Sequence, residues 1–523
     1  MRAAVVVLAC LGFVSLGGCV IYLNPLCNDQ IVNGDETGID CGGSCPGKCE
    51  VGGGCRTDAD CDDAICMGGV CTAKPCDNGK QDGQETDVDC GGGGGAGLAC
   101  RACAGGRKCL VDADCFSPGG CNPVTKTCSA LTVSFAPEVR YFSGYKAYAL
   151  LSGDLDGDGH ADLAVINEYG SSVAVFLDNV TTGAFTRLAN PAGKPPDEPD
   201  NRALNFGPTG AYPTGGGVAD FNHDGKLDVV TADYHGYSVT VLLNDGTGKL
   251  KTQAAPYPTE AKAETSNLAV GDLNKDGNPD VVATNPQTAS VSVFLSHADG
   301  TLDPAINLQV GVMNGAQPYS AVIADFDGDG NNDLAVAEEM SGQIFVRLGH
   351  GDGTFGDETG YAIDGTRDYI LIAHDMNNDK KLDLVCANRN GDTVSVLLGR
   401  GDGTFRKAIV SSVGPPDVMK MAGRPWFGPY NVAVADVNQD GVPDVVTPNF
   451  VGDSVSILLG IGDGHFAPAI ELKYDKPTDP MFTSTTPYGI VVGDFNGDGK
   501  PDIATANAGS DDLTIRLNTG QKN

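Results

Sequence analysis

The chain has 523 residues, of which 68 are acidic and 34 are basic, so its formal net charge is −34. This length suits one large domain and a smaller one. A surface of this charge repels nucleic-acid phosphates, which excludes DNA or RNA as a partner.

The N-terminus has the pattern of an export signal. Arg2 precedes an apolar run, residues 3–16, which is too short to span a bilayer. The run ends in Leu-Gly-Gly-Cys at residues 16–19, and this sequence resembles a bacterial lipobox.

That resemblance implies a lipoprotein signal peptide at residues 1–18, lipidation of Cys19 and a lipidated tether at residues 19–26. An ordinary secretory signal cleaved nearby is the alternative. Val20, not Asp, follows the cysteine, which by the lipoprotein rule favours sorting to the outer membrane or cell surface. No later segment is long and apolar enough to cross a membrane, so the lipid anchor is the expected membrane contact.

Sixteen of the nineteen cysteines lie between residues 27 and 128, in two groups of eight. We expect two modules, at residues 27–71 and 76–128. The region has too few apolar residues for a core, and an even cysteine count in an exported chain indicates disulfides, with the pairing open. A zinc cluster is the rival interpretation, because Cys100 and Cys103 have ligand spacing, although no histidine lies in the region. The expected role is a protease-resistant stalk; a small binding role stays open.

One acidic motif organises the rest of the chain. It reads D-x-[N/D]-x-D-G-x-x-D, and seven copies begin at Asp154, Asp220, Asp272, Asp325, Asp375, Asp436 and Asp494. The steps between copies are 66, 52, 53, 50, 61 and 58 residues. A nearly fixed period of this size indicates a repeat architecture.

The motif supplies the oxygens that calcium prefers, with carboxylates or amides at loop positions 1, 3, 5 and 9. The candidate ligands, loop by loop, are Asp154, Asp156, Asp158 and Asp162 with the carbonyl of His160; Asp220, Asn222, Asp224 and Asp228; Asp272, Asn274, Asp276 and Asp280; Asp325, Asp327, Asp329 and Asp333; Asp375, Asn377, Asp379 and Asp383; Asp436, Asn438, Asp440 and Asp444; and Asp494, Asn496, Asp498 and Asp502. A metal-free Asp-Gly turn is the alternative for one loop. Seven loops in register favour calcium, with up to seven Ca²⁺ ions.

The loops differ from one another at two positions. Position 6 is Gly in six loops, and Gly adopts the positive φ of a tight wrap at no steric cost. The fifth loop has Lys380 there, so we expect strain or weaker binding. Position 3 is Asp only in the first and fourth loops, at Asp156 and Asp327, so these loops should bind calcium most tightly.

Short apolar segments flank every loop and have the length and composition of strands. A third strand follows, for example at residues 172–177 or 454–459, and then a Gly-rich turn and a weaker fourth strand. Four antiparallel strands in each of seven repeats predict an all-β fold. The expected architecture is a seven-bladed β-propeller over residues 133–523, preceded by the two small disulfide-rich modules.

The repeats resemble the FG-GAP/VCBS family, the calcium-loop β-propellers of integrin α-subunits and some fungal lectins. The resemblance rests on the loop motif, which all seven copies match apart from Lys380, and it covers residues 133–523. Because each loop joins the first two strands of its repeat, all seven should lie on one face of the ring.

The two ends of the predicted ring are complementary. The last repeat stops after its third strand, at residues 517–520, and residues 135–139 resemble the fourth strand of the sixth repeat at residues 466–470. We therefore expect residues near 133–142 to complete the last blade, because a closed ring hides the sheet edges of an open array.

The face opposite the loops is the candidate ligand face. Five repeats have Tyr at the entrance of the innermost strand, and one of the longest connections there holds the only Trp. The candidate residues are Tyr148, Tyr319, Tyr369, Trp426, Tyr430 and Tyr488. Five second strands end in Asn, and aromatic rings beside amides suit a sugar or a protein loop. The alternative is that the rings pack the inner wall and the Asn side chains cap turns.

These features favour a non-enzymatic, calcium-binding surface lipoprotein whose propeller binds a carbohydrate or a protein partner. A polysaccharide lyase or hydrolase with an axial active site is the alternative, since propellers also host enzymes. No nucleophile elbow or zinc-hydrolase motif stands out from the repeats. A structural envelope component is the third possibility.

Overall fold

A computed structural model of the chain describes residues 64–67, 70–73, 133–178, 183–188, 212–311, 316–363, 368–414, 427–475 and 484–520. The chain divides into two units, Met1–Ala130 and Leu131–Asn523. In the first unit, β1 (Ala64–Met67) pairs antiparallel with β2 (Val70–Ala73). The predicted signal peptide, the tether, Cys19 and the rest of both cysteine-rich modules lie outside the described residues.

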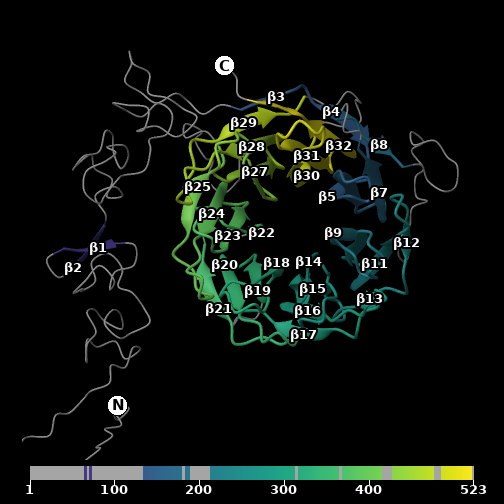
Figure 1. The fold of residues 1–523 in the computed structure, drawn as a ribbon, viewed down its shortest axis with the longest axis horizontal. Coiled ribbons are helices and arrows are strands. Elements are labelled where there is room, and N and C mark those ends of the chain that lie inside the picture. The colour runs from purple at the N-terminus through teal and green to yellow at the C-terminus, as the bar shows by residue number, and fades with distance from the viewer. Residues whose placement is uncertain are drawn as a thin grey trace, which may run out of the picture. The chain divides into compact units, whose positions relative to one another are not determined.

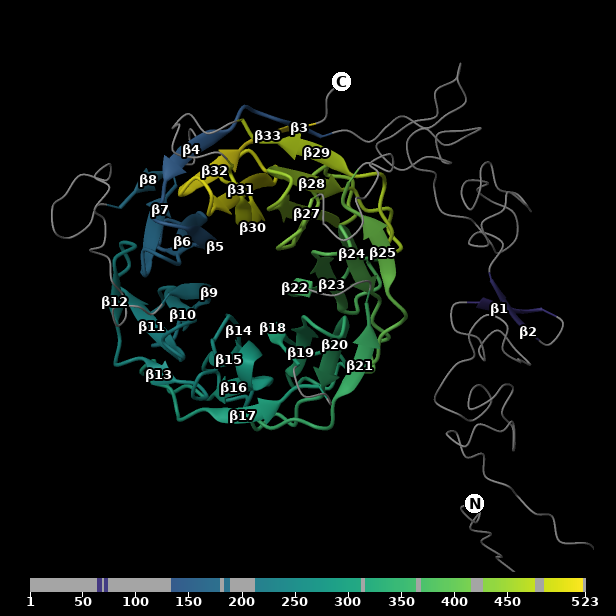
Figure 2. The ribbon, with the colours of Figure 1, turned by 180° about the vertical axis from the view of Figure 1, so that it is seen from behind.

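The second unit is the predicted seven-bladed β-propeller, a ring of seven antiparallel sheets around a central channel (Figure 1). Six blades have four strands, and the second has a fifth, β13 (Tyr257–Pro258). The blades follow one another around the ring in chain order, and the view from behind shows the same succession (Figure 2). A single 3₁₀ turn, Pro286–Thr288, interrupts the described strands, and no helix among the described residues is long and apolar enough to cross a membrane.

Each blade runs from an innermost strand beside the channel to an outer strand at the rim of the ring. The innermost strands are β5 (Ala147–Gly153), β9 (Pro213–Ala219), β14 (Asn267–Gly271), β18 (Pro318–Ala324), β22 (Asp368–His374), β26 (Ala433–Ala435) and β30 (Pro487–Gly493). The second strands are β6 (Asp162–Asn167), β10 (Asp228–Asp233), β15 (Asp280–Asn285), β19 (Asp333–Glu338), β23 (Asp383–Asn388), β27 (Asp444–Asn449) and β31 (Asp502–Asn507). The third strands are β7 (Ser172–Leu177), β11 (Ser238–Asn244), β16 (Ser290–Phe294), β20 (Gln343–Arg347), β24 (Thr393–Leu397), β28 (Ser454–Leu458) and β32 (Asp512–Arg516). The outer strands are β8 (Thr186–Arg187), β12 (Leu250–Thr252), β17 (Ile306–Gln309), β21 (Thr359–Ala362), β25 (Ile409–Ser412), β29 (Ile470–Lys473) and β4 (Val139–Phe142).

The core lies between the blades. Every second strand is buried along its whole length. Because side chains alternate across a strand, Leu163 and Val165 of β6 pack toward the last blade, while Ala164 and Ile166 pack toward the second. Seven clusters of buried apolar side chains result, each drawn from two neighbouring blades. Closing the ring is therefore what completes the core.

The ring closes as the sequence predicts. β4, from the start of the domain, pairs with β32 as the outer strand of the last blade, and β3 (Ser134–Phe135) pairs with β33 (Asn518–Gly520). The seam also holds ion pairs: Glu138, whose side chain is 5% exposed, lies 2.6 Å from Arg140 and 2.5 Å from Arg516. One buried carboxylate thus joins residues from the two ends of the domain.

We expect the change Glu138→Gln to lower the free energy of unfolding of the propeller by about 2–3 kcal/mol, because it leaves two partly buried guanidinium groups without their shared anion. Urea denaturation followed by circular dichroism would measure the loss. The control is Lys473→Gln, which removes a 74% exposed ammonium 3.8 Å from Glu471 and should change stability by less than about 0.5 kcal/mol. Equal effects of the two changes would show that the seam does not depend on Glu138.

Candidate metal centres and ligand face

Each acidic loop connects the inner strand of a blade to its second strand, so all seven loops lie on one face of the ring, as predicted. Position 2 of every loop is an apolar residue with its side chain buried in the core. These residues are Leu155, Phe221, Leu273, Phe326, Met376, Val437 and Phe495. Burial of this side chain fixes the start of the loop against the sheet.

The last aspartate of each loop, at position 9, is fully buried and fastens the loop to two strands. In the first loop, Asp162 Oδ2 accepts a hydrogen bond of 2.8 Å from the N–H of Leu155, and its Oδ1 accepts one of 2.9 Å from the N–H of Asp178. The same pair of bonds recurs at Asp228, Asp280, Asp333, Asp383, Asp444 and Asp502. A carboxylate oxygen that accepts one such bond retains a lone pair for a cation, whereas Asp162 Oδ2 also accepts a bond of 3.2 Å from the N–H of Asp156. The sequence predicts these residues as ligands and does not predict this clamp.

The other loop oxygens accept backbone N–H groups of their own loop. In the first loop, Asp154 Oδ2 accepts from Gly159 at 2.9 Å, and Asp158 Oδ1 accepts from His160 at 2.9 Å. Equivalent hydrogen bonds form within the other six loops. The loops therefore hold their oxygen-bearing side chains in place through bonds of their own.

Three carboxylates converge in the first and fourth loops, the two loops that have Asp at position 3. Each residue of a group offers one oxygen, and these oxygens lie within 4.8 Å of one another. The groups are Asp154, Asp156 and Asp162, and Asp325, Asp327 and Asp333. Asp158 and Asp329, at position 5, stand outside these groups.

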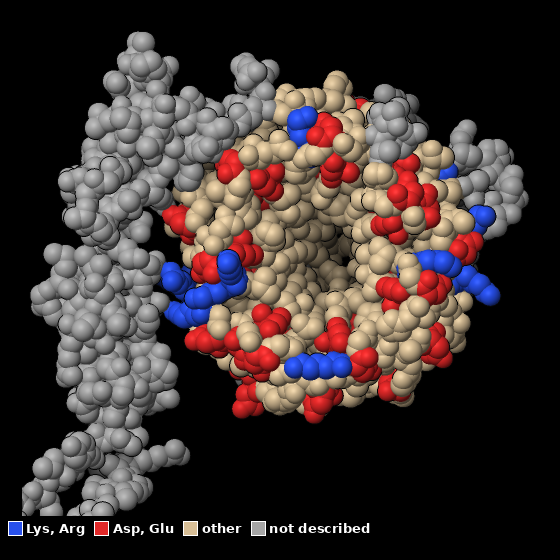
Figure 3. All heavy atoms as spheres, in the orientation of Figure 1, with Lys and Arg blue, Asp and Glu red and all other residues tan. Residues whose placement is uncertain are grey.

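The donor set fits a hard divalent cation such as Ca²⁺, because every side-chain donor in the motif is an oxygen. Burial, with nearby loop carboxylates, raises the pKa of Asp333 to about 6 and that of Asp444 to about 8. Beside the first loop, both carboxylate oxygens of Asp178 are buried without a hydrogen-bond partner among the described residues. A cation would offset this concentration of negative charge, which Figure 3 shows as separate acidic clusters around the central hollow.

Two residues in every loop have a left-handed backbone. At position 6, six glycines have φ between 80° and 90°, and Lys380 has φ 67°, the strained geometry expected in the fifth loop. Position 4 is left-handed as well, even where it is not Gly, as at His223 and Gln439. The sequence predicts the first of these positions and does not predict the second.

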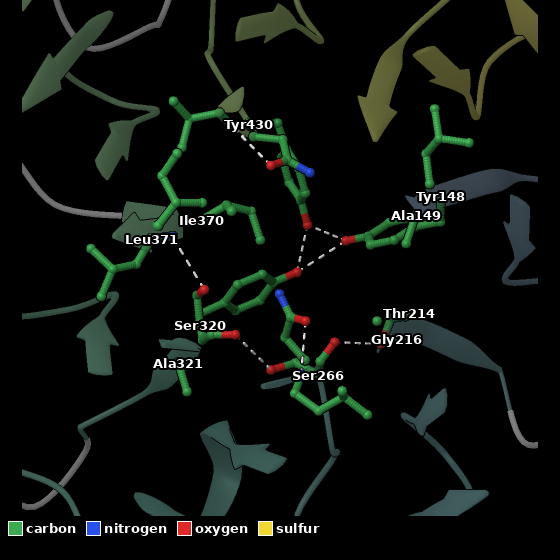
Figure 4. Close-up of a pocket in the computed structure, with 18 of the residues that line it drawn as sticks. Tyr148, Ala149, Thr214, Gly216, Ser266, Ser320, Ala321, Ile370, Leu371 and Tyr430 are labelled. Carbon is green, nitrogen blue, oxygen red and sulfur yellow. Dashed lines mark hydrogen bonds between the residues drawn. The ribbon is translucent and has the colours of Figure 1, made fainter. Parts of the chain in front are cut away.

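On the opposite face, tyrosines at the entrances of the inner strands line the central cavity. The hydroxyl groups of Tyr148, Tyr319 and Tyr430 hydrogen-bond to one another, at 3.0 Å for the first two (Figure 4). The ring of Tyr488 stacks on Tyr148 with centroids 4.7 Å apart. Burial raises the pKa of Tyr148 and Tyr430 well above the usual value. The four rings thus pack together, as the alternative interpretation expects, at one end of an axial cavity of about 250 Å³.

The structure does not describe the side chains of two predicted ligand-face residues. Trp426 lies outside the described residues, and so does the side chain of Tyr369, whose backbone belongs to β22.

The amides that end the second strands lie inside the blades. Asn388 Nδ2 donates to Thr393 Oγ1 at 2.9 Å and to Ser395 Oγ at 2.8 Å, both on the third strand. The same two-bond pattern recurs at Asn285, Asn449 and Asn507. All four side chains are fully buried. They therefore join two strands of a blade and do not reach a ligand.

A row of partly exposed rings lies on this face in the first two blades. Tyr169, 62% exposed, packs edge-on against Tyr212 with centroids 5.8 Å apart, and His235 lies 5.0 Å from Tyr212 and 4.9 Å from Tyr234. The Nζ of Lys146 lies 4.3 Å over the Tyr169 ring. The repeat pattern does not predict this row; the available signal was the aromatic residues in the turns after two neighbouring second strands.

The fold and the loops define a β-propeller with acidic, metal-type loops on one face. Parts of the chain match the FG-GAP-like repeat, at residues 220–283, 272–336 and 375–447, and the FG-GAP repeat, at residues 147–184 and 486–522. The chain belongs to the FG-GAP repeat family. Repeats of this family are typically calcium-binding and are typical of extracellular or cell-surface proteins.

Individual proteins share part of this architecture. A segment is 39% identical to human integrin alpha-7 over 99 residues, which span 17% of this chain and 8% of the integrin. Among solved structures, virginiamycin B lyase from Staphylococcus aureus is 13% identical, covers 73% of this chain and 99% of its own, and has a TM-score of 0.47. A lectin from Agrocybe aegerita that recognises non-reducing terminal N-acetylglucosamine is 19% identical over 73% of this chain and 87% of its own, with a TM-score of 0.44.

We expect Asp327→Asn to weaken calcium binding at the fourth loop by about tenfold, because it replaces a charged ligand with a neutral one. The matched change in the opposite direction, Asn274→Asp in the third loop, should strengthen binding there. Isothermal titration with Ca²⁺, with the bound ions counted by native mass spectrometry, would measure both. Changes of the same sign in the two variants would contradict the role given to position 3.

The pH dependence of stability should reveal one blade that departs from the amide pattern. In the second blade, buried Asp233 takes the place of Asn and accepts hydrogen bonds from Thr231, Ser238 and Thr240. Burial raises the pKa of Asp233 to about 6. Because this value exceeds that of the unfolded chain, the stability contributed by the protonated group is fully present below pH about 4 and is lost as pH rises through about 6.

Asp233→Asn should therefore raise the free energy of unfolding at pH 7.5 by about 1–3 kcal/mol and have less effect near pH 4.5. Urea denaturation in chelator at both pH values would test this without a contribution from calcium. Asn285→Asp, the reverse change in the third blade, should destabilise at pH 7.5. A loss of stability in Asp233→Asn that is equal at both pH values would refute the assignment.

Proposed function

We propose that the protein is a non-enzymatic, calcium-binding surface protein, exported and lipid-anchored to a bacterial envelope, whose propeller binds a carbohydrate. The observation that carries the proposal is the set of seven oxygen-lined loops, each held by a fully buried aspartate on one face of a closed ring. Export is supported by the N-terminal pattern and by the typical location of FG-GAP proteins.

Calcium in this proposal stabilises the scaffold. The loops carry 23 aspartates at their ligand positions. In the first loop the ninth residue is bonded both to the loop and to the residue that follows the third strand. An ion in the loop offsets repulsion among these carboxylates and makes the scaffold more rigid. Because it binds only the folded loops, it also raises stability by mass action.

The ligand surface in this proposal is the partly exposed row of Tyr169, Tyr212, Tyr234 and His235, on the face opposite the loops. Aromatic rings with one exposed face stack on the apolar face of a sugar. The hydroxyl of Tyr234 donates to Glu264 at 2.7 Å, which holds that ring in place. Lys146 pairs with Glu168 at 2.6 Å beside the row and supplies charged donors and acceptors. The tyrosine cluster of the channel forms a rigid floor next to it.

A glycan array probed with the full chain tests the proposal. We expect retained carbohydrate in Ca²⁺ and at least a tenfold loss of signal in Tyr169→Ala. The matched control is Met340→Ala, which truncates a 54% exposed side chain at the equivalent turn of the fourth blade and should leave binding unchanged. Chelation should lower the melting temperature, by an amount that grows with the calcium concentration used for comparison.

Three results would overturn parts of this proposal separately. Identical melting in calcium and in chelator would remove the calcium role. Capture of an envelope protein with no retained sugar would replace the carbohydrate by a protein partner. Turnover of a polysaccharide would make the protein an enzyme.

A further inference from the structure

Four of the seven acidic loops have a side chain at position 4 although the backbone there is left-handed. These residues are His223 (φ 56°), Lys275 (φ 62°), Asn378 (φ 59°) and Gln439 (φ 57°). The other three loops have Gly at this position, namely Gly157, Gly328 and Gly497. A non-glycine residue in this conformation costs on the order of 1 kcal/mol and persists where something else requires the side chain.

In two loops the side chain reaches the same atom of the next loop around the ring. Asn378 Nδ2 donates to the carbonyl oxygen of Gly441 at 2.9 Å, and Gln439 Nε2 donates to the carbonyl oxygen of Gly499 at 2.8 Å. Both acceptors are position 6 of the neighbouring loop. The same two glycines donate their N–H groups to the first aspartates of their own loops, Asp436 and Asp494, at 2.8 and 2.7 Å.

The other two side chains also reach forward by one loop. His223 Nε2 lies 2.7 Å from Asn278 Oδ1, at position 7 of the third loop. The ammonium of Lys275 lies against position 6 of the fourth loop, since a Cβ built on Gly330 would stand 3.8 Å from its Nζ. Three of the four side chains therefore hydrogen-bond position 6 or 7 of the next loop, and the fourth, that of Lys275, lies close to position 6.

These links divide the loops into two runs. Hydrogen bonds join loop two to loop three and, separately, loops five, six and seven, and Lys275 reaches from loop three toward loop four. Each run ends at a loop with Gly in position 4. The first loop also has Gly at position 4, so no link of this kind leads from it to the second.

We propose that the fourth-position residues are positioning residues for the neighbouring calcium site, so that loops two to four and loops five to seven each fill with calcium cooperatively. The inference rests on the calcium binding proposed above. The link fixes the peptide unit between positions 6 and 7, next to the position 7 carbonyl that is a candidate ligand. An ion that orders one loop also orders the side chain that holds the next loop. Binding of a second ion to that next loop therefore costs less conformational entropy.

The test is the double variant Asn378→Gly, Gln439→Gly in the full chain, titrated with Ca²⁺ by calorimetry, with bound ions counted by native mass spectrometry. We expect a three- to tenfold loss of affinity in the second run and a Hill coefficient that falls toward unity. The melting temperature in chelator should stay the same or rise, because glycine removes the left-handed strain. A merely structural role would instead lower it.

Two single variants complete the design. Lys380→Gly relieves the same strain in the fifth loop, at a position whose bond to Asp375 comes from its backbone N–H, and it should leave the cooperativity intact. Gln439→Asn keeps an amide at the position, as Asn378 does naturally, and should retain most of the affinity. The inference is wrong if the double variant titrates like the native chain, or if Lys380→Gly abolishes cooperativity equally. A native chain that binds no calcium would overturn the proposed function instead.

Discussion

The buried aspartate that ends each acidic loop is the constraint on which the propeller depends. It is also the first residue of the second strand, the most deeply buried strand of the blade. In the first blade its two oxygens accept N–H groups from the loop and from Asp178, the residue after the third strand, so one carboxylate joins three segments of chain. Burial of that carboxylate raises its pKa and places negative charge at one end of every sheet. The group that holds the sheet together is thus the group whose charge a bound cation would compensate.

The arrangement of the core explains why the ring behaves as one unit. Each apolar cluster is drawn from two blades, so a single blade leaves both of its buried faces exposed. The last interface forms only when β4 joins β32 and the ends of the domain meet. The ion pairs of Glu138 lie at this seam, where the chain cannot supply a covalent connection. Local loop chemistry and ring closure therefore stabilise the same set of interfaces.

Much of this architecture could be predicted from the sequence, because it follows from periodicity. The motif fixes the number of blades, the third strand expected at residues 172–177 is β7, and the unmatched ends predict the closure. The periodicity does not reveal which way a side chain points or which groups it hydrogen-bonds. The terminal amides, such as Asn388, recur as a ligand group would, yet they bond Ser and Thr hydroxyls inside the blade. The tyrosines recur at the channel entrance, yet three of them bond one another.

In a ring of repeats, residues shared by all blades build the scaffold, and departures from the shared pattern distinguish one blade from another. The shared set here is the ninth-position clamp, the buried second position and the left-handed fourth and sixth positions. The departures include an extra carboxylate in the first and fourth loops, side chains instead of Gly at position 4, Asp233 in place of a buried Asn, and partly exposed rings on blades one and two. Fold requirements cannot explain them, because neighbouring blades fold without them. The strained fourth position is the clearest example, since glycine satisfies the backbone in three loops and a linking side chain is kept in four.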